Sequence, residues 1–302
     1  RMLAAGKVEF QSPELNGRTH QLSATFLASP SGAADGSGTT PTGGQQGSTR
    51  LVSDSDKAPS SVFDISASQI HLDLSLAGKR AQPAAATCEG SVLLRQVKTP
   101  KPGDAPMVVT GDRLEVKGLD DQARITVFGR GNGTQSGDGL ATVEAQGMAV
   151  SARQVHADQK AGSFWVDGSG QAVMHVDGEM LGQPQGTPTP VTLTWQKSLR
   201  GEGQRVIIDG RVQVVSQQSL IQADRAVATL SQPLSMARDR AKGGKLEVAE
   251  VGLEGNVVID YRSHDAAGQQ SHENMQLAQV SINRLTGEIK GTLINQVFVA
   301  GI

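Results

Sequence analysis

The sequence predicts an all-β protein, and three observations support this prediction. In residues 205–215, apolar side chains recur at every second position, at Val206, Ile208, Val212 and Val214, and positions 209, 211 and 213 are charged or polar. A period of two is typical of a half-buried strand, because successive side chains point to opposite faces. The 302 residues include 36 Gly and 12 Pro, which favours many short elements joined by turns. Aromatic residues make up only 3%, so the core must be aliphatic.

The N-terminal part of the chain divides into two segments of different character. Residues 1–27 are predicted to be strands, since Val8 and Phe10 alternate with charged residues, and Asn16-Gly17 is predicted to form a turn. Residues 28–60 consist almost entirely of Gly, Ser, Thr, Pro, Ala and Asp. Such a composition cannot bury enough apolar surface to offset the entropy of ordering. We expect residues 28–60 to be a disordered insertion.

Residues 61–302 are predicted to carry the main β-fold, as one body or as two fused halves with a boundary near residues 183–190. Alternating apolar runs mark the expected strands, which lie within residues 62–76, 90–94, 108–128, 141–177, 191–195, 205–230, 253–261 and from 280 onward. Polar links rich in Gly, Ser and Pro separate these runs. Residues 231–245 are expected to be a connection, with a short helical turn as the alternative.

Composition excludes several classes of function. The formal net charge is −2 and no basic patch is visible, so nucleic acid is not expected as a partner. A single cysteine, Cys88, excludes an internal disulfide and a cysteine-based zinc site. No apolar run approaches the roughly 18 residues that a membrane-spanning helix needs. No signal peptide is visible. The start at Arg1 suggests a piece of a longer polypeptide, so any targeting segment could lie outside this sequence.

Three His-x-Asp pairs are the strongest candidates for site chemistry: His71 with Asp73, His156 with Asp158, and His175 with Asp177. Residues two apart share one face of a strand, so each pair could touch one metal ion. In each pair the residue between lies on the apolar phase, which predicts that His and Asp face solvent. No nucleophile elbow occurs, and no helix follows the Gly-rich residues 129–133. We therefore expect no catalytic residue, no metal site and no cofactor.

The two tryptophans lie in different contexts. Trp195 shares the apolar phase of Val191 and Leu193, which predicts a core position. Trp165 stands between Phe164 and Val166, so that an aromatic side chain lies on each phase and one of them faces outward. The outward-facing aromatic marks an edge contact, a mouth of the trough or an ordinary surface position.

A Gly-x-Val pattern recurs along the chain. It begins at Gly6, Gly90, Gly210 and Gly255, with a looser copy at Gly147. After each copy comes a second strand in which Gly or Ala precedes a polar residue, as in Gly111-Asp112 and Ala223-Asp224. The intervals between copies differ, which disfavours a solenoid of fixed repeat length and favours degenerate strand pairs wound into one body.

This pattern, clearest in VIIDGRVQVVSQQSLIQADRAVATL and in EGSVLLRQ with VVTGDRLEVKGLDDQARITVFG, resembles the OstA/LptA-like family of lipopolysaccharide-transport proteins. The resemblance covers residues 88–300, with residues 1–27 as a fainter copy. It implies a twisted antiparallel β-jellyroll, open at its ends, in the periplasm or cell envelope. It also implies acyl chains bound along an apolar inner face and edge-strand pairing of like domains. The insertion at 28–60 and the length of the chain depart from a single short domain of this kind.

The predicted functional surface is the apolar face of a curved sheet, which forms a trough. Aliphatic lipid chains can fill such a trough, because each CH₂ removed from water contributes about 0.8 kcal/mol. An aliphatic inner face is also what an ordinary packed core looks like, so a structural or interaction module without a lipid is the alternative. A carbohydrate-cleaving β-helix needs clustered acidic residues that the sequence lacks. The residues expected on the lipid-binding face are Val92, Leu114, Ile125, Val127, Val206, Ile208, Val212, Val214, Leu253, Val257 and Ile259.

Overall fold

The computed structural model confirms that the protein is all-β. It describes residues 2–11, 15–27, 62–77, 80–98, 106–118, 123–130, 139–145, 147–176, 189–217, 219–233, 248–264, 270–283, 286 and 288–300. No helix occurs among these residues, and the strands join into one large sheet. The predicted insertion at 28–60 lies outside the described residues, as do residues 234–245 of the predicted connection at 231–245.

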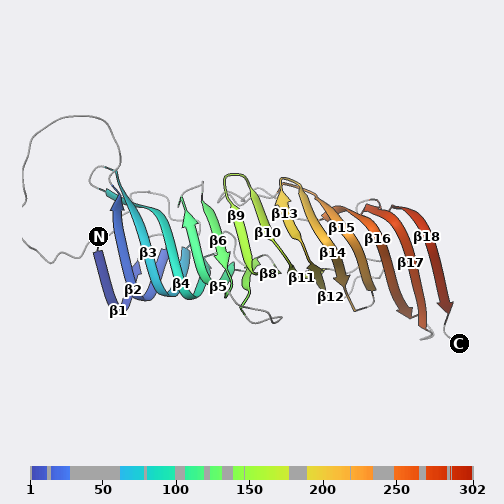
Figure 1. The fold of residues 1–302 in the computed structure, drawn as a ribbon, viewed down its shortest axis with the longest axis horizontal. Coiled ribbons are helices and arrows are strands. Elements are labelled where there is room, and N and C mark those ends of the chain that lie inside the picture. The colour runs from blue at the N-terminus through green and yellow to red at the C-terminus, as the bar shows by residue number, and fades with distance from the viewer. Residues whose placement is uncertain are drawn as a thin grey trace, which may run out of the picture.

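The described residues form 18 strands that follow one another along an elongated body, with β1 at one end and β18 at the other (Figure 1). The strands are β1 (Met2–Gln11), β2 (Leu15–Leu27), β3 (Val62–Ala77), β4 (Arg80–Lys98), β5 (Val108–Lys117), β6 (Arg124–Phe128), β7 (Ala141–Ala145), β8 (Met148–Ala152), β9 (Gln154–Asp158), β10 (Ser163–Asp167), β11 (Gly170–Val176), β12 (Thr189–Trp195), β13 (Ser198–Glu202), β14 (Arg205–Val215), β15 (Ser219–Leu230), β16 (Val248–His264), β17 (Gln270–Asn283) and β18 (Ile289–Ala300).

The sheet divides in its middle into two rows of short strands. Strands β1 to β5 pair in chain order, and β5 then pairs with both β6 and β7. One row runs β6–β9–β10–β13 and the other β7–β8–β11–β12. Both rows rejoin at β14, and β14 to β18 again pair in chain order. We call the first row and its continuation into the long strands wall A, and the second row and its continuation wall B.

One junction differs from the predicted antiparallel arrangement. Strands β2 and β3 pair in parallel, from Leu15 beside Phe63 to Leu27 beside Ser75, whereas every other pairing in the described sheet is antiparallel. The prediction of a wholly antiparallel sheet is therefore wrong at this place. Parallel neighbours need a long connection between them, and the segment between β2 and β3 is the longest link in the chain.

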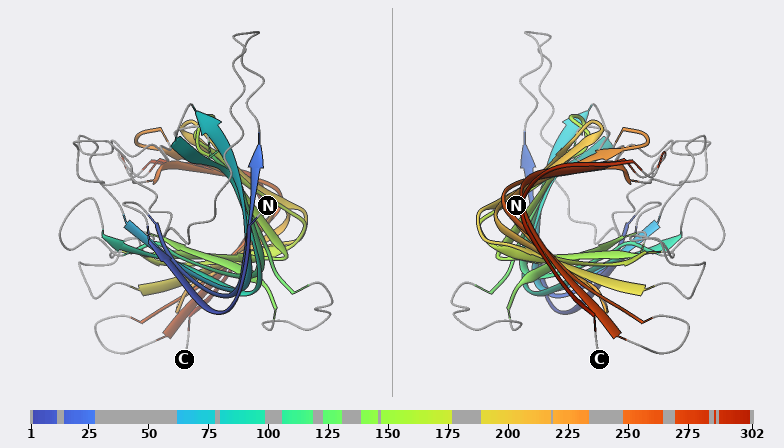
Figure 2. Two further views of the ribbon diagram at one scale, coloured as in Figure 1. Left: turned by 90° about the vertical axis from the view of Figure 1, so that its left-hand side faces the viewer. Right: turned by 90° about the vertical axis from the view of Figure 1, so that its right-hand side faces the viewer.

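The long strands turn from one wall to the other at corners. Seen along the long axis, they curve around a common interior (Figure 2). In β14, Gly210 and Arg211 together face the single residue Asp224 of β15, which makes a β-bulge. Their φ angles are +87° and +43°, a conformation that Gly adopts readily and other residues rarely. Similar bulges occur at Gly90-Ser91 and Gly255-Asn256.

The core lies on the inner face between the two walls. It is one cluster of buried, mainly aliphatic side chains that extends from β2 to β17. Trp195 is 2% exposed, which confirms its predicted core position, and its indole Nε1 donates a hydrogen bond to the Gly168 carbonyl at 3.1 Å. Trp195 covers Gly170 so closely that a Cβ there would lie 2.4 Å from the indole ring.

The predicted turn at Asn16-Gly17 is wrong, because both residues lie inside β2. Gly17 pairs with Phe10 of β1 and is buried under the Phe10 ring. A Cβ at Gly17 would lie 1.9 Å from that ring, so the glycine here makes room for an aromatic side chain. Asn-Gly is a turn signal only where the chain must adopt positive φ, and at Gly17 it does not.

Most of the region expected to hold a boundary between two halves, residues 183–188, lies outside the described residues. Strands on its two sides nevertheless pair directly, since β11 (Gly170–Val176) lies beside β12 (Thr189–Trp195). Strands β10 and β13 pair in the same way. The sheet is thus continuous on both sides of residues 177–188.

Candidate apolar binding face

The eleven residues predicted for the lipid-binding face all lie on the inner face of the sheet. Eight are buried and belong to the core cluster: Val92, Leu114, Val127, Ile208, Val212, Leu253, Val257 and Ile259. Three are half-buried and pack against that cluster: Ile125, Val206 and Val214. Period-two alternation thus brings residues from β4, β5, β6, β14 and β16 onto one continuous surface.

Exposure along this inner face changes from the middle to the ends. Leu114 and Val127, in the body of the sheet, are each 1% exposed. At one end Met2 pairs with the buried Ala24, so it continues the inner face, yet it is 46% exposed. At the other end Leu293 pairs with the buried Leu277 and is 53% exposed. The apolar surface is therefore closed by packing in the middle and exposed at both ends.

The outer face is polar, and it carries two of the His-x-Asp pairs. His71 Nε2 lies 3.1 Å from Asp73 Oδ1, and its Nδ1 lies 2.6 Å from the hydroxyl of Ser23 on β2. Both side chains of the pair are about one-third exposed, as predicted for a solvent-facing phase. His175 is exposed, and Asp177 lies outside the described residues.

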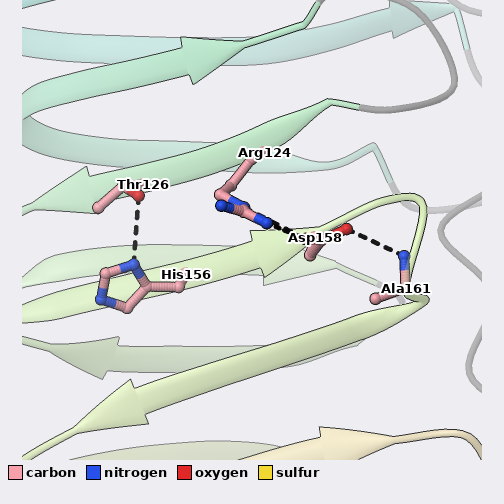
Figure 3. A network of polar contacts seen from close by, with 5 residues as sticks. All are labelled: Arg124, Thr126, His156, Asp158 and Ala161. Atoms are coloured by element: carbon pink, nitrogen blue, oxygen red, sulfur yellow. Dashed lines mark hydrogen bonds and ion pairs between the residues drawn. The ribbon is translucent and has the colours of Figure 1, made fainter.

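The second pair, His156 and Asp158, reaches two different partners on β6 (Figure 3). His156 Nδ1 is 3.2 Å from the Thr126 hydroxyl, and the His156 ring stacks on Trp165 with centroids 4.7 Å apart. Burial beside these groups lowers the pKa of His156, so the neutral ring is favoured. Trp165 is therefore the outward-facing aromatic of β10.

Asp158 is held by hydrogen bonds from two neighbouring donors. It accepts from the backbone N–H of Ala161 at 2.9 Å and from the Arg124 guanidinium at 2.9 Å. These two donors hold the pKa of Asp158 below its usual range, the Ala161 N–H contributing most. The pair serves as a cross-strand contact that ties β9 to β6 near a turn.

Other candidate groups for chemistry are unsuited to it. Cys88 is 1% exposed, and burial raises the pKa of its thiol to about 12, so the reactive thiolate is disfavoured. Within the described residues, no cluster of three or more His, Cys, Asp or Glu side chains could hold a metal ion. The same residues contain no helix long and apolar enough to cross a bilayer.

Sequence reasoning missed a set of ion pairs beside the corners. Arg225 Nε lies 3.4 Å from Asp209 of β14, and its Nη1 lies 3.5 Å from Glu254 of β16. Arg113 approaches Glu89 in the corresponding way at 3.9 Å. In each case an acid precedes the corner glycine and the arginine follows an aspartate. That signal is visible in the sequence, but only the strand register shows which groups meet.

No protein-family model matches the chain, and no curated protein matches it either. We therefore base the proposed function on the geometry, together with the sequence resemblance described above. Two features of the structure bear on function. The inner face is apolar from end to end, and the two end strands carry exposed apolar side chains.

Proposed function

We propose that this protein is a non-enzymatic component of the cell envelope, located in the periplasm, that binds the acyl chains of lipopolysaccharide or of a similar lipid. The chains would lie along the apolar inner face of a jellyroll-like trough. The main support is that this face runs unbroken from β2 to β17 and continues in exposed apolar side chains at both ends. Burying such surface and lipid CH₂ groups together is favourable and needs no specific polar motif.

The strands at the two ends of the body favour pairing with a second domain of the same fold. In the described sheet the residue-by-residue registers pair β1 only with β2 and β18 only with β17, at opposite ends of the body (Figure 1). Edge strands leave backbone N–H and C=O groups unpaired, which makes them templates for another strand. Exposed Leu3 at β1 and Ile289 and Ile294 at β18 give these edges apolar surface. We propose that like domains pair end to end there and extend the trough.

A specific observation also favours the structural alternative. Side chains such as Leu114, Val127 and Val257 are 1% exposed, as in an ordinary protein core. In a purely structural module this packing would continue to the ends and no lipid would enter. In the lipid-binding protein, acyl chains contact the half-buried positions Ile125, Val206 and Val214, where inner side chains are less tightly covered.

Binding of a fluorescent fatty acid to the purified chain, and its displacement by lipopolysaccharide, tests this function. We expect saturable binding that Val206→Asp weakens, because the new carboxylate would sit on the apolar face. The matched control is Asp209→Asn on the same strand, whose side chain faces outward and pairs with Arg225. Fluorescence no higher than with an unrelated β-protein would overturn the proposal.

A further inference from the structure

The hairpin formed by β1 and β2 is attached to the rest of the protein in an unusual way. Its only described sheet partner is β3, and this junction is the parallel one. Parallel pairing is slightly less stable per residue than antiparallel pairing, and an isolated two-stranded hairpin is marginally stable in water. Strand β1 itself is exposed or half-buried along its length. The hairpin is therefore joined to the rest of the described sheet by one junction only, the parallel one.

Strand direction shows what else could occupy the β3 edge. Strand β18 runs from wall A, where residues 289–292 pair with β17, into wall B. Strand β1 runs the same way, with residues 2–5 in wall A and 8–11 in wall B, whereas β3 runs from wall B to wall A. If a second copy continues the first with its walls aligned, its β18 would lie parallel to β1 but antiparallel to β3.

The side chains of β18 also fit the β3 edge. Leu22 and Ala24 of the hairpin now pair with the buried Ile70 and Leu72 of β3. On β18 the inner-face positions carry Ile289 and Leu293, which are aliphatic and more than half exposed. Strand β18 changes walls after Thr292 and β3 changes walls between Ser66 and Gln69, so an antiparallel pair can align corner with corner. This is the arrangement that β3 already has with β4 on its other edge.

We propose that the N-terminal hairpin is an internal cover for β3, and that β18 of a second copy is the strand that this edge accepts when the hairpin leaves. The proposal rests on the end-to-end pairing put forward above, assigns the accepting edge to β3 in place of the outer edge of β1, and adds the regulation of that pairing. The covered form is a monomer at this end, because an intramolecular strand is favoured over an intermolecular one at low protein concentration. When β18 of the second copy displaces the hairpin, the parallel β2–β3 junction is replaced by an antiparallel β18–β3 junction. Walls A and B then continue from one copy into the next.

A reversible lock tests whether the hairpin must leave. Asn16 Nδ2 and Asp64 Oδ1 lie 2.9 Å apart across the β2–β3 junction, so the double variant N16C/D64C places two thiols side by side. Oxidised, this variant should stay monomeric at every concentration in light scattering. In the reduced state, the molar mass should rise with concentration by about twofold or more, as pairing of two copies requires. Equal masses in the two states would overturn the proposal.

Cross-linking between copies identifies the edge that β18 meets. Thr292 precedes the corner of β18 and Gln69 follows that of β3, and both side chains are exposed. Full-length T292C mixed with Q69C should form a disulfide-linked dimer, and its yield should fall when I289E is added to the T292C chain. Cross-linking of T292C to A5C on β1 instead would overturn the hairpin cover while leaving end-to-end pairing intact. Lipid binding measured on the same samples reports separately on the proposed ligand.

Discussion

The chain passes from one wall to the other at corners, and the corners of the flanking strands differ in structure from those of the central strands. In β4, β14 and β16 the strand continues through a bulge whose two residues both have positive φ, as at Gly210-Arg211. In the centre the strand is interrupted instead. Strand β8 ends at Ala152 and β9 begins at Gln154, so the chain leaves wall B at Arg153 and enters wall A.

The central corners are held by backbone hydrogen bonds between neighbouring corners. Gly168 N–H donates to the Lys197 carbonyl at 2.7 Å, and Gln196 N–H donates to the Gly210 carbonyl at 2.7 Å. One corner thus supports the next along the body. A bulge corner therefore depends on its own glycine. The interrupted corners at Arg153 and Gln196-Lys197 have no glycine of their own and depend on backbone hydrogen bonds to neighbouring corners.

The largest expected effect breaks a bulge corner directly. Gly210→Ala places a Cβ 2.9 Å from the backbone nitrogen of Lys197 at a φ of +87°. We expect the free energy of unfolding to fall by about 2 kcal/mol. Equilibrium urea unfolding measures this change. The control Gly252→Ala, where a Cβ would meet only the Val227 carbonyl oxygen at 3.8 Å, should stay within about 0.5 kcal/mol of the parent. Equal losses in the two variants would contradict the account of the bulge.

An interrupted corner should fail through its neighbour instead. Trp195→Phe removes the indole N–H that bonds the Gly168 carbonyl and leaves that acceptor without its side-chain donor. The expected loss is about 1–2 kcal/mol in the same unfolding experiment. Trp165→Phe is the matched control, because Trp165 lies on the outer face and stacks on His156. A larger loss from the control than from Trp195→Phe would show that the corner does not depend on this hydrogen bond.

The ion pairs beside the bulge corners should contribute less. Arg225→Met removes the contacts with Asp209 and Glu254, whose side chains are both more than 40% exposed. We expect a loss of about 0.5–1 kcal/mol at low salt, most of which disappears in 1 M NaCl because exposed charges are screened. Urea unfolding at two salt concentrations checks this. A loss independent of salt would assign the role of Arg225 to packing of its aliphatic stem.

The smallest effect concerns acid stability in the central region. Asp158 has a lowered pKa in the folded protein, so its contribution is present above the ordinary Asp pKa and is lost as pH falls through the folded value. Asp158→Asn should therefore weaken folding at pH 7 and flatten the stability profile in the acid range. Thermal unfolding between neutral and acid pH follows both changes. An unaltered acid slope would show that the carboxylate is not stabilised by Ala161 and Arg124.

The sequence could predict whatever depends on local alternation or on a glycine with a conformational role. It therefore predicted the β-strands, the core position of Trp195 and the shared phase of the eleven apolar residues. It also singled out Gly90, Gly210 and Gly255 as a recurring pattern, but not as corners. It could not predict the corner at Arg153, because nothing in that residue marks a change of wall. The parallel β2–β3 junction also escaped prediction, since strand direction depends on which edge a segment meets. The turn predicted at Asn16-Gly17 was wrong because the glycine there makes room for the Phe10 ring inside a strand.

Site-specific photo-cross-linking tests the central claim, that acyl chains lie on the inner face, most directly. A benzophenone amino acid replaces either Val214, which is half-buried on the inner face, or its neighbour Gln213, which is half-buried on the outer face. Each variant is irradiated with radiolabelled lipopolysaccharide, and the labelled protein is quantified. We predict strong labelling from position 214, competed by unlabelled lipopolysaccharide, and background labelling from position 213. Equal labelling from the two positions, or none from 214, would contradict the account.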